Sequence, residues 1–262
     1  MTDDPAPDYG LIDRAGIGRS VFYPRPDFSP PPPGASDHRI EVEAGVAIAG
    51  RFYPLGASLP SLLYFHGNGE VASDYDGIAP VFRQFGMNLF VADYRGYGAS
   101  GGTPSFAALV SDAHPVLDSF HDLLDEGGFT GPRFLMGRSL GAHPAIELAA
   151  RRPERMNGLV IESGAGNLRR LMRYLGGEPD GPTAELIDLH SRKIAAISLP
   201  VLVIHGAEDE LIAVEQAIEF HAALSVADKE LVIIRGAGHN DIMWVGLRQY
   251  FESIAAFVKR HG

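Results

Sequence analysis

The feature that most constrains the fold of this chain is a series of short, uninterrupted apolar runs separated by helical patterns. Runs of this length are typical of strands that are buried on both faces, as in a parallel sheet covered by helices. Between them, apolar residues recur at helical spacing, which predicts helices over about 103–124, 141–151, 213–224 and 241–260. The chain is therefore expected to form an α/β sheet. The runs are Leu62–Phe65, Leu89–Ala92, Phe134–Met136, Leu159–Ile161, Val201–Ile204 and Leu231–Ile234.

The first of the expected helices begins at Thr103, with Pro104 in its first turn, and Pro115 is expected to kink it. Before the first run, apolar and polar residues alternate on both sides of Gly45, which predicts an antiparallel hairpin. Residues 24–33 hold a cluster of prolines that favours an extended segment.

These patterns predict three regions along the chain. We expect residues 1–38 to form a Pro-rich lead-in and residues 39–262 a single domain. Residues 163–199 interrupt the alternation of strands and helices, and we expect them to form a small helical cap over one end of the sheet.

Composition excludes several functions. The 262 residues include 22 Lys and Arg against 33 Asp and Glu, a formal net charge of −11, which disfavours binding to nucleic acid or to anionic membranes. The chain has no cysteine, so a cysteine nucleophile and Cys-ligated zinc are excluded. No apolar run approaches the roughly 18 residues of a membrane span, and the acidic start is unlike a signal peptide. We expect a cytoplasmic protein without membrane insertion, and no pattern predicts an oligomeric state.

Two segments match the G-x-S-x-G pattern of serine nucleophiles, and their contexts differ. Ser139, in Gly137–Gly141, directly follows an apolar run and precedes a helical pattern. That context predicts the sharp strand-to-helix turn that exposes a nucleophilic hydroxyl at the edge of a sheet. Ser100, in Gly98–Gly102, lies eight residues after a run in a glycine-rich loop. Ser139 is the predicted nucleophile, and Ser100 is predicted to be a loop serine.

A serine hydroxyl needs a base to take its proton and a third group to orient that base. His239 is the predicted base because it lies in a glycine-rich loop between the last apolar run and the final helix. His66 and His205 each precede a glycine at the end of a run and are expected to stabilise turns.

The predicted acid is Asp209, in the turn after the fifth run, with Glu208 and Glu210 as solvated neighbours. Glu162 remains a competing acid, because it also stands at the end of a strand. The order Ser139, Asp209, His239 is the order of residues in α/β-hydrolase triads.

The oxyanion of an acyl-transfer intermediate requires N–H donors. The predicted donors are the backbone N–H groups of Leu140 and Asn68, with Gly69 as an alternative to Asn68. The chain contains no metal-binding or nucleotide-binding signature, so we expect neither a metal nor another cofactor.

Five strings resemble those of serine hydrolases in the α/β-hydrolase superfamily: YFHGNGE, ADYRGYGASGGTPS, GRSLGAHPA, LPVLVIHGAEDELI and GAGHND. They are most similar to the Bem46-like branch, alongside protein depalmitoylases and serine aminopeptidase-type esterases. The resemblance implies a mostly parallel, eight-stranded sheet with a cap over the carboxyl ends of the strands. It also implies the same roles for Ser139, Asp209 and His239, and for the N–H groups of Asn68 and Leu140. The chain lacks the N-terminal cysteine cluster of the palmitoyl-protein thioesterases, and its cap is short.

The expected substrate is a small-molecule carboxylic ester or thioester with a small to medium apolar acyl group. Leu171 and Met172 of the cap, together with Trp244 shortly after His239, are the predicted pocket residues. Two alternatives stay open. One is an aminopeptidase-type serine peptidase, in which acidic residues near positions 162 and 208–210 would bind a substrate amine. The other is a non-catalytic ligand-binding protein on the same scaffold.

Overall fold

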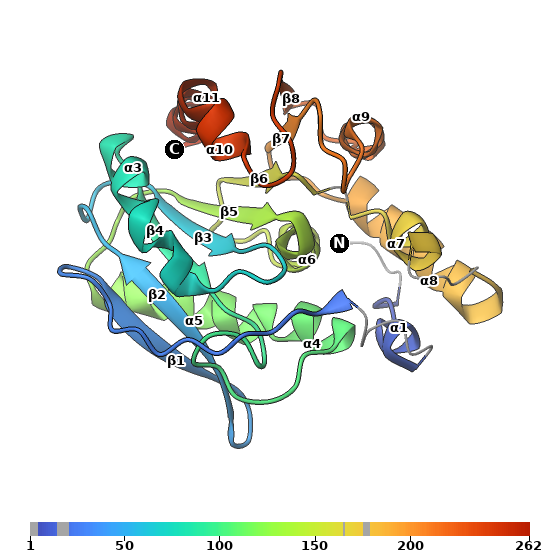
Figure 1. Ribbon diagram of the computed structural model, residues 1–262, viewed down its shortest axis with the longest axis horizontal. Coiled ribbons are helices and arrows are strands. Elements are labelled where there is room, and N and C mark those ends of the chain that lie inside the picture. Colours follow the sequence, from blue (N-terminus) through green and yellow to red (C-terminus); the bar gives the residue numbers. More distant parts are fainter. Residues whose placement is uncertain (1–4, 15–20, 165, 175–178) are drawn as a thin grey trace.

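The computed structural model describes residues 5–14, 21–164, 166–174 and 179–262. Its eight strands form one sheet in the order β1-β2-β4-β3-β5-β6-β7-β8. The first two strands form an antiparallel hairpin, β2 pairs antiparallel with β4, and all other neighbours are parallel (Figure 1). The predicted fold class is therefore confirmed. The strands are β1 (Ser36–Glu43), β2 (Val46–Tyr53), β3 (Ser61–Phe65), β4 (Asn88–Ala92), β5 (Arg133–Arg138), β6 (Gly158–Glu162), β7 (Val201–Gly206) and β8 (Lys229–Ile234).

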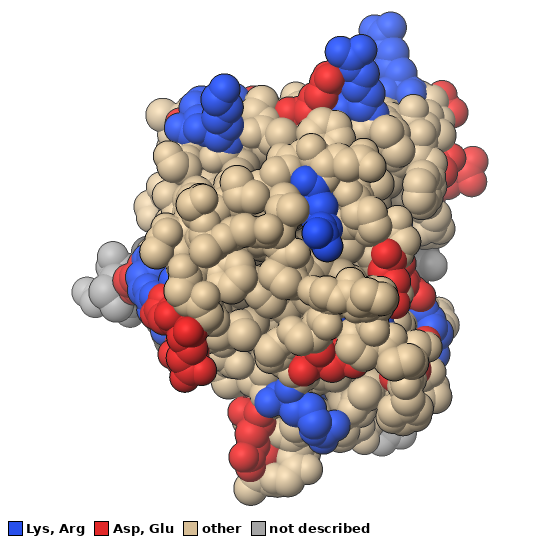
Figure 2. Space-filling view, turned by 90° about the vertical axis from the view of Figure 1, so that its left-hand side faces the viewer, with Lys and Arg blue, Asp and Glu red and all other residues tan. Residues whose placement is uncertain are grey.

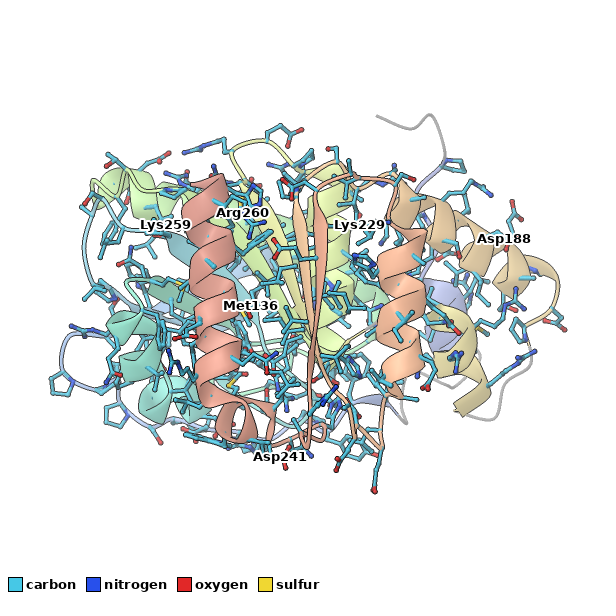
Figure 3. The ribbon with its side chains drawn as sticks, turned by 90° about the horizontal axis from the view of Figure 1, so that it is seen from above. Met136, Asp188, Lys229, Asp241, Lys259 and Arg260 are labelled. Atoms are coloured by element: carbon cyan, nitrogen blue, oxygen red, sulfur yellow. The ribbon has the colours of Figure 1, made fainter. Side chains whose placement is uncertain are left out.

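The alternation of side chains along each strand divides the core into two layers. In β3, Leu63 and Phe65 pack on one face of the sheet, and Leu62 and Tyr64 pack on the other. Figure 3 shows helices on both sides of the β8 edge. The first face is covered by α4 (Phe106–Ser111), α5 (Ala113–Glu126), α6 (Ala142–Arg151), α8 (Gly181–Ala195) and α9 (Val214–Ala223). The second is covered by η1 (Ala72–Gly77), α3 (Ala79–Gln84) and α11 (Leu247–His261).

Two of the four predicted helices match observed single helices, α6 and α9. The helix expected over 103–124 is instead two helices, α4 and α5. Ser105 rather than Thr103 caps α4, since its side chain accepts a hydrogen bond from Ala108 N. Pro115 lies in the first turn of α5, where its missing N–H is not needed, so the chain starts a new helix there instead of kinking one.

The helix expected over 241–260 is also interrupted. It consists of α10 (Ile242–Val245) and α11, with Gly246 between them. A Cβ atom at Gly246 would lie 2.4 Å from Ile234 Cγ2, so only glycine permits this close approach to β8.

The described cap residues lie between β6 and β7 and include α7 (Leu168–Tyr174) and α8. These two helices stand beyond the carboxyl ends of the central strands (Figure 1). Residues 165 and 175–178 of the expected cap, and residues 1–4 and 15–20 of the expected lead-in, lie outside the described part of the chain.

Residues 5–14, which we call the N-terminal tether, connect the cap to the main domain. Their helix α1 (Gly10–Arg14) packs against α4 and α8. The Tyr9 hydroxyl lies 2.8 Å from His190 Nδ1 in α8. The Asp13 carboxylate accepts hydrogen bonds from the first two backbone N–H groups of α4, at 2.8 and 3.0 Å. The tether therefore holds the N-terminus of α4 and the middle of α8 together.

The side of the molecule away from the cap carries acidic and basic side chains of both signs interspersed around an uncharged centre (Figure 2). Among the described residues, no helix has the length and apolar composition required to span a membrane.

Candidate active site

Ser139 stands on a strained turn between β5 and α6. Its φ is 51°, in the left-handed region, which costs a residue other than glycine about 1–2 kcal/mol. The flanking glycines make the turn possible. A Cβ on Gly137 would lie 2.3 Å from the Gly141 carbonyl oxygen, and one on Gly141 would lie 2.1 Å from the Phe65 carbonyl oxygen. The turn places Ser139 at the carboxyl edge of the sheet, as its sequence context predicts.

Ser100, in the second G-x-S-x-G segment, has a different environment. Its hydroxyl accepts a hydrogen bond from Ala49 N in β2 at 2.8 Å. It therefore fastens the loop after β4 to the hairpin, and it is not among the residues that line the pocket around Ser139.

Three predicted residues come together by hydrogen bonds. His239 Nε2 lies 3.0 Å from Ser139 Oγ, and His239 Nδ1 lies 2.8 Å from Asp209 Oδ2. The other Asp209 oxygen accepts hydrogen bonds from the backbone N–H groups of Leu211 and Ile212. With Nδ1–H directed to Asp209, the Nε2 lone pair faces the serine hydroxyl, which is the arrangement that allows imidazole to accept a proton.

The Asp209 carboxylate is held in its charged form. Burial raises its pKa, but hydrogen bonds from His205, His239 and the Ile212 backbone outweigh burial and hold the pKa well below its usual value. The contribution of His205 to the Asp209 pKa goes beyond the turn-stabilising role that the sequence predicts. His205 Nε2 lies 2.7 Å from the Ile212 carbonyl oxygen and 3.3 Å from Asp209 Oδ2, so it supports the acid as well as its turn.

Glu162, the competing acid, is fully buried in a separate polar cluster beneath Ser139. Its carboxylate accepts hydrogen bonds from the Tyr64 and Tyr250 hydroxyls and from Arg138 Nε. Burial raises its pKa above the ordinary value. Because these partners occupy both carboxylate oxygens, Asp209 and not Glu162 is the acid bonded to His239.

Arg138, the residue before Ser139, connects the loops around the site. Its guanidinium donates to the His239 carbonyl oxygen at 2.9 Å and to Asn240 Oδ1 at 3.2 Å. It also pairs with Glu162 Oε1 at 3.1 Å and with Glu70 Oε1 at 3.0 Å. One buried cation thus holds the His239 loop and the loop after β3 against the turn that carries Ser139.

The sequence carries a signal for the Arg138–Glu162 pair. Arg138 and Glu162 end the neighbouring strands β5 and β6 and are register partners in the parallel ladder. A cation and an anion at paired positions, both directly after apolar runs, indicate a buried ion pair.

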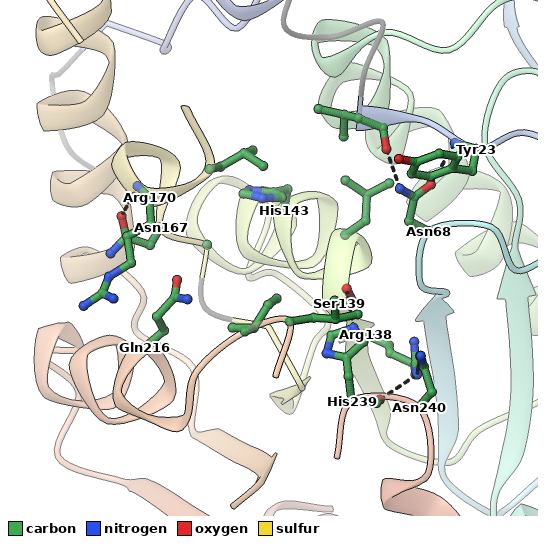
Figure 4. A pocket seen from close by; sticks show the side chains of 16 residues that line it. Tyr23, Asn68, Arg138, Ser139, His143, Asn167, Arg170, Gln216, His239 and Asn240 are labelled. Atoms are coloured by element: carbon green, nitrogen blue, oxygen red, sulfur yellow. Dashed lines mark hydrogen bonds between the residues drawn. The ribbon is translucent and has the colours of Figure 1, made fainter. Parts of the chain in front are cut away.

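A cavity of about 490 Å³ opens beside Ser139 and reaches the cap (Figure 4). Asn68 and Leu140, the predicted oxyanion residues, both line it. The Asn68 side chain is held in place, because its Oδ1 accepts hydrogen bonds from Tyr97 OH at 2.7 Å and Tyr23 N at 3.0 Å. The loop that carries the Asn68 backbone N–H is therefore fixed next to Ser139.

Of the three predicted pocket residues, the structure places only Leu171 on the pocket wall. Met172 is buried in the main core with Leu168, four residues before it on the same face of α7. Trp244 is on α10 with 60% of its surface exposed, away from the pocket. Sequence reasoning missed other wall residues, among them Val21, Tyr23, His143 and Gln216.

One group of described residues has the composition of a metal site. Oxygen and nitrogen atoms of Asp228, Glu230 and His261 lie within 4.8 Å of one another. Glu230 is already paired with Arg260 at 2.7 Å. The group is at the opposite end of the sheet from the His239 loop, as the positions of Arg260 and Asp241 in Figure 3 show. It is not part of the site around Ser139.

Comparison with known proteins adds a family context. A family model described as serine aminopeptidase, S33 matches residues 58–178 and 183–243. The chain is 30% identical over 251 residues to an uncharacterized protein of Mycobacterium tuberculosis, covering 92% of this chain and 86% of that protein. It is 31% identical over 214 residues to alpha/beta hydrolase domain-containing protein 17B of Homo sapiens, covering 76% of this chain and 66% of the human protein.

Two solved structures share the fold. The esterase Pf2001 of Pyrococcus furiosus superposes with a TM-score of 0.72 at 21% identity, covering 92% of this chain and all of that one. Est1E of Butyrivibrio proteoclasticus, with ferulic acid bound, superposes with a TM-score of 0.69 at 18% identity, covering 86% of this chain and 98% of that one.

Proposed function

The chain belongs to the serine aminopeptidase, S33 family of α/β hydrolases, and within this hydrolase family we propose that it is a serine hydrolase that cleaves carboxylic esters or thioesters. The observation that carries this proposal is the hydrogen-bonded series from Ser139 Oγ through His239 to Asp209, at 3.0 and 2.8 Å. A binding protein on the same scaffold does not need a base directed at a strained serine.

In the proposed reaction, Ser139 Oγ attacks the scissile carbonyl carbon while His239 Nε2 takes the hydroxyl proton. The backbone N–H groups of Leu140 and Asn68 stabilise the oxyanion that forms. His239 then returns the proton to the departing alcohol or thiol, which leaves an acyl group on Ser139. Water, deprotonated by His239, attacks this acyl group and releases the carboxylic acid. Asp209 stays ionised throughout and orients the imidazole.

The pocket favours esters over peptides with a free amino terminus. Its volume of about 490 Å³ lies within the usual range for small-molecule sites. Among the described residues that line it, none is Asp or Glu, so the lining offers no carboxylate to bind an α-ammonium group. Of the acidic residues near positions 162 and 208–210, Glu162 binds Arg138 and Asp209 binds His239, and Glu208 and Glu210 do not line the pocket.

The test compares two serines that match the same short pattern. Ser139→Ala is expected to lower kcat/KM for p-nitrophenyl esters by at least about 10⁴-fold and to abolish labelling by a fluorophosphonate. Ser100→Ala is the matched control and should keep both. A series of acyl chains from acetate to palmitate measures the chain length that the pocket accepts. Aminoacyl p-nitroanilides are assayed in parallel. Turnover of the anilides alone, or equal activity in both variants, would refute the proposal.

A further inference from the structure

Two buried histidines lie side by side at the cap end of the pocket, and they differ in their hydrogen bonds. The ring centroids of His143 and His190 are 5.9 Å apart, and the residues are 7% and 2% exposed. His190 uses both ring nitrogens, with Nδ1 at 2.8 Å from Tyr9 OH and Nε2 at 2.7 Å from the Gly166 carbonyl oxygen. The His143 ring makes no hydrogen bond to the described part of the chain, and its Nδ1 is buried without a partner.

This difference separates a structural histidine from one that is available to a ligand. A buried polar group that has lost its water and gained no partner costs free energy, so native structures hold few of them and each requires an explanation. His143 packs edge-on against Phe106, with centroids 4.8 Å apart, and lines the pocket on α6, four residues after Ser139 (Figure 4). Nδ1 is closed off from the pocket, so Nε2, which also has no partner among the described residues, is the ring nitrogen that a bound molecule can reach.

The neighbouring pocket wall carries further uncharged polar groups. Gln216 of α9 and Asn167 before α7 also line the pocket, on the side of His143 away from Asn68 (Figure 4). The Gln216 carboxamide makes no hydrogen bond within the described chain, whereas Asn167 Oδ1 accepts one from Arg170 N at 3.1 Å. The Arg170 guanidinium, on the same wall, is paired with Glu219 at 2.6 Å.

We propose that His143 and Gln216 form a subsite that binds an uncharged hydrogen-bonding group of the substrate, such as an amide or a hydroxyl. The inference rests on the proposed esterase function and narrows its substrate class. It replaces the plain apolar acyl group expected from the sequence with one that carries a polar group. His143 follows Ser139 by four residues, through the serine turn and into the start of α6, so we place the polar group a few bonds from the scissile carbonyl.

The charges around the subsite favour a neutral ligand group. Burial and the positive charge of Lys193 lower the pKa of His143 to about 3, so its imidazole is neutral, and its accessible Nε2 serves as a donor or an acceptor according to the tautomer. A substrate ammonium would find no carboxylate among the described residues that line the pocket. A substrate carboxylate would have to compete with Glu219 for Arg170, and the Lys193 ammonium is already bound to Glu147 at 2.7 Å.

The test uses two p-nitrophenyl esters of nearly equal shape. The acyl group of the first is 3-acetamidopropanoyl, which places an amide at the fourth and fifth positions. The acyl group of the second is 5-methylhexanoyl, its apolar isostere. We expect wild-type kcat/KM to be about tenfold higher for the amide ester, as two neutral hydrogen bonds would give. An ester with an acyl chain ending in a carboxylate should be a poorer substrate than the amide ester.

His143→Leu removes both ring nitrogens at similar volume and should reduce the preference to near unity by slowing the amide ester far more than the apolar ester. His143→Gln keeps a donor and an acceptor and should restore part of the preference. Gln216→Leu, on a half-exposed helix position, tests the second member without disturbing the core. A wild-type enzyme that prefers the apolar or the carboxylate ester, or a His143→Leu variant that slows both esters equally, would overturn the subsite.

Binding of the same two esters to Ser139→Ala, measured by calorimetry, separates this inference from the proposed function. Tighter binding of the amide ester that is lost in Ser139→Ala/His143→Leu supports the subsite even if the wild type turns over neither ester, a result that would refute only the esterase proposal. Turnover of both esters with equal affinities would refute only the subsite.

Discussion

The two walls of the pocket are held by different forces. The sheet wall, which consists of Arg138, Ser139, His239 and Asn240, is fixed by hydrogen bonds and buried ion pairs that join three loops. The cap wall, which consists of His143, Asn167, Leu171 and Gln216, includes polar side chains that have no partner in the described part of the chain, and it is held from behind by the N-terminal tether.

Under the proposed function, the two walls have different roles: the sheet wall carries the reacting groups, and the cap wall selects the substrate. Catalytic groups must be held in place to within a fraction of an ångström, and the dense contacts of the sheet wall provide this. Groups that select a substrate must be free to bond with it, which requires that they lack partners in the protein. Substitutions in the sheet wall should therefore change rate or stability, and substitutions in the cap wall should change preference.

The largest effect on this comparison is expected from Asp209→Asn. The amide cannot hold the imidazole in the tautomer that Ser139 requires, so kcat for ester hydrolysis should fall by about 10³–10⁴-fold with little change in KM. Glu208→Gln, one residue earlier and exposed, is the control and should keep full activity. If Glu162→Gln lowered kcat more than Asp209→Asn, the assignment of the acid would be wrong.

Removal of the Arg138 cation should destabilise the whole sheet wall. Arg138→Met leaves the Glu162 carboxylate buried without its ion pair, and loss of one partner of such a pair costs about 3–5 kcal/mol. Urea unfolding measures this loss. Arg138→Met/Glu162→Gln should recover part of it, because the buried negative charge is then absent. Arg248→Met, at an exposed ion pair on α11, should change the free energy of unfolding by less than about 1 kcal/mol.

Acid should lower the free energy of unfolding through the cap wall, because that wall contains His143. The pKa of His143 is lowered to about 3 in the folded protein and is near 6.5 in an unfolded chain. Between these values the unfolded chain binds a proton that the folded chain does not, so stability is fully present above pH 6.5 and falls as the pH falls. His143→Leu should remove about 1.4 kcal/mol of this loss per pH unit.

Urea unfolding of wild type and His143→Leu at pH 8, 7, 6 and 5 tests this expectation. The difference between the two proteins should be constant at pH 8 and 7 and should shift in favour of the variant below pH 6. If the free energies of unfolding of the two proteins differed by the same amount at every pH, His143 would be protonated as easily in the folded protein as in the unfolded chain.

The smallest effect is expected from the N-terminal tether. Tyr9→Phe removes the hydroxyl that contacts His190 and accepts a hydrogen bond from Lys193, at a cost of about 1–2 kcal/mol in the free energy of unfolding. The ratio of amide-ester to apolar-ester activity should decrease, because the cap wall loosens. Activity on p-nitrophenyl acetate should be unchanged, since its acyl group does not reach the cap. An equal loss on all three esters would contradict the separation of the two walls.

The sequence was sufficient for the sheet because its signals are local. Each central strand is a continuous apolar run, and the turn at Ser139 is marked by glycines that close contacts require. Helix boundaries depend on distant partners and were less predictable. Asp112, at the break between α4 and α5, binds the Arg95 side chain at 2.7 and 2.8 Å, and nothing near it in the sequence indicates that pair.

The pocket was the least predictable part for the same reason. Leu171 and Met172 are adjacent and equally apolar, but only the packing of α7 on the core decides which of them faces the pocket. Gln216 reaches the pocket from α9, which packs on β7 and β8. The sequence pattern around His143 indicates only a packing residue on an amphipathic helix. Roles of this kind follow from tertiary contacts that residue spacing does not record.

The N-terminal tether also has a consequence for the order of folding. Tyr9 and His190 are 181 residues apart in the chain, so their contact closes a loop that spans most of the protein. Loop closure on this scale is entropically costly and slow, and a growing chain cannot make the contact until more than two thirds of it has been synthesised. Strands β1 to β6 and the serine turn can form earlier. We expect pulse-labelled amide exchange during refolding to protect β3 and β5 before α8, so that the cap is the last part of the structure around the pocket to form.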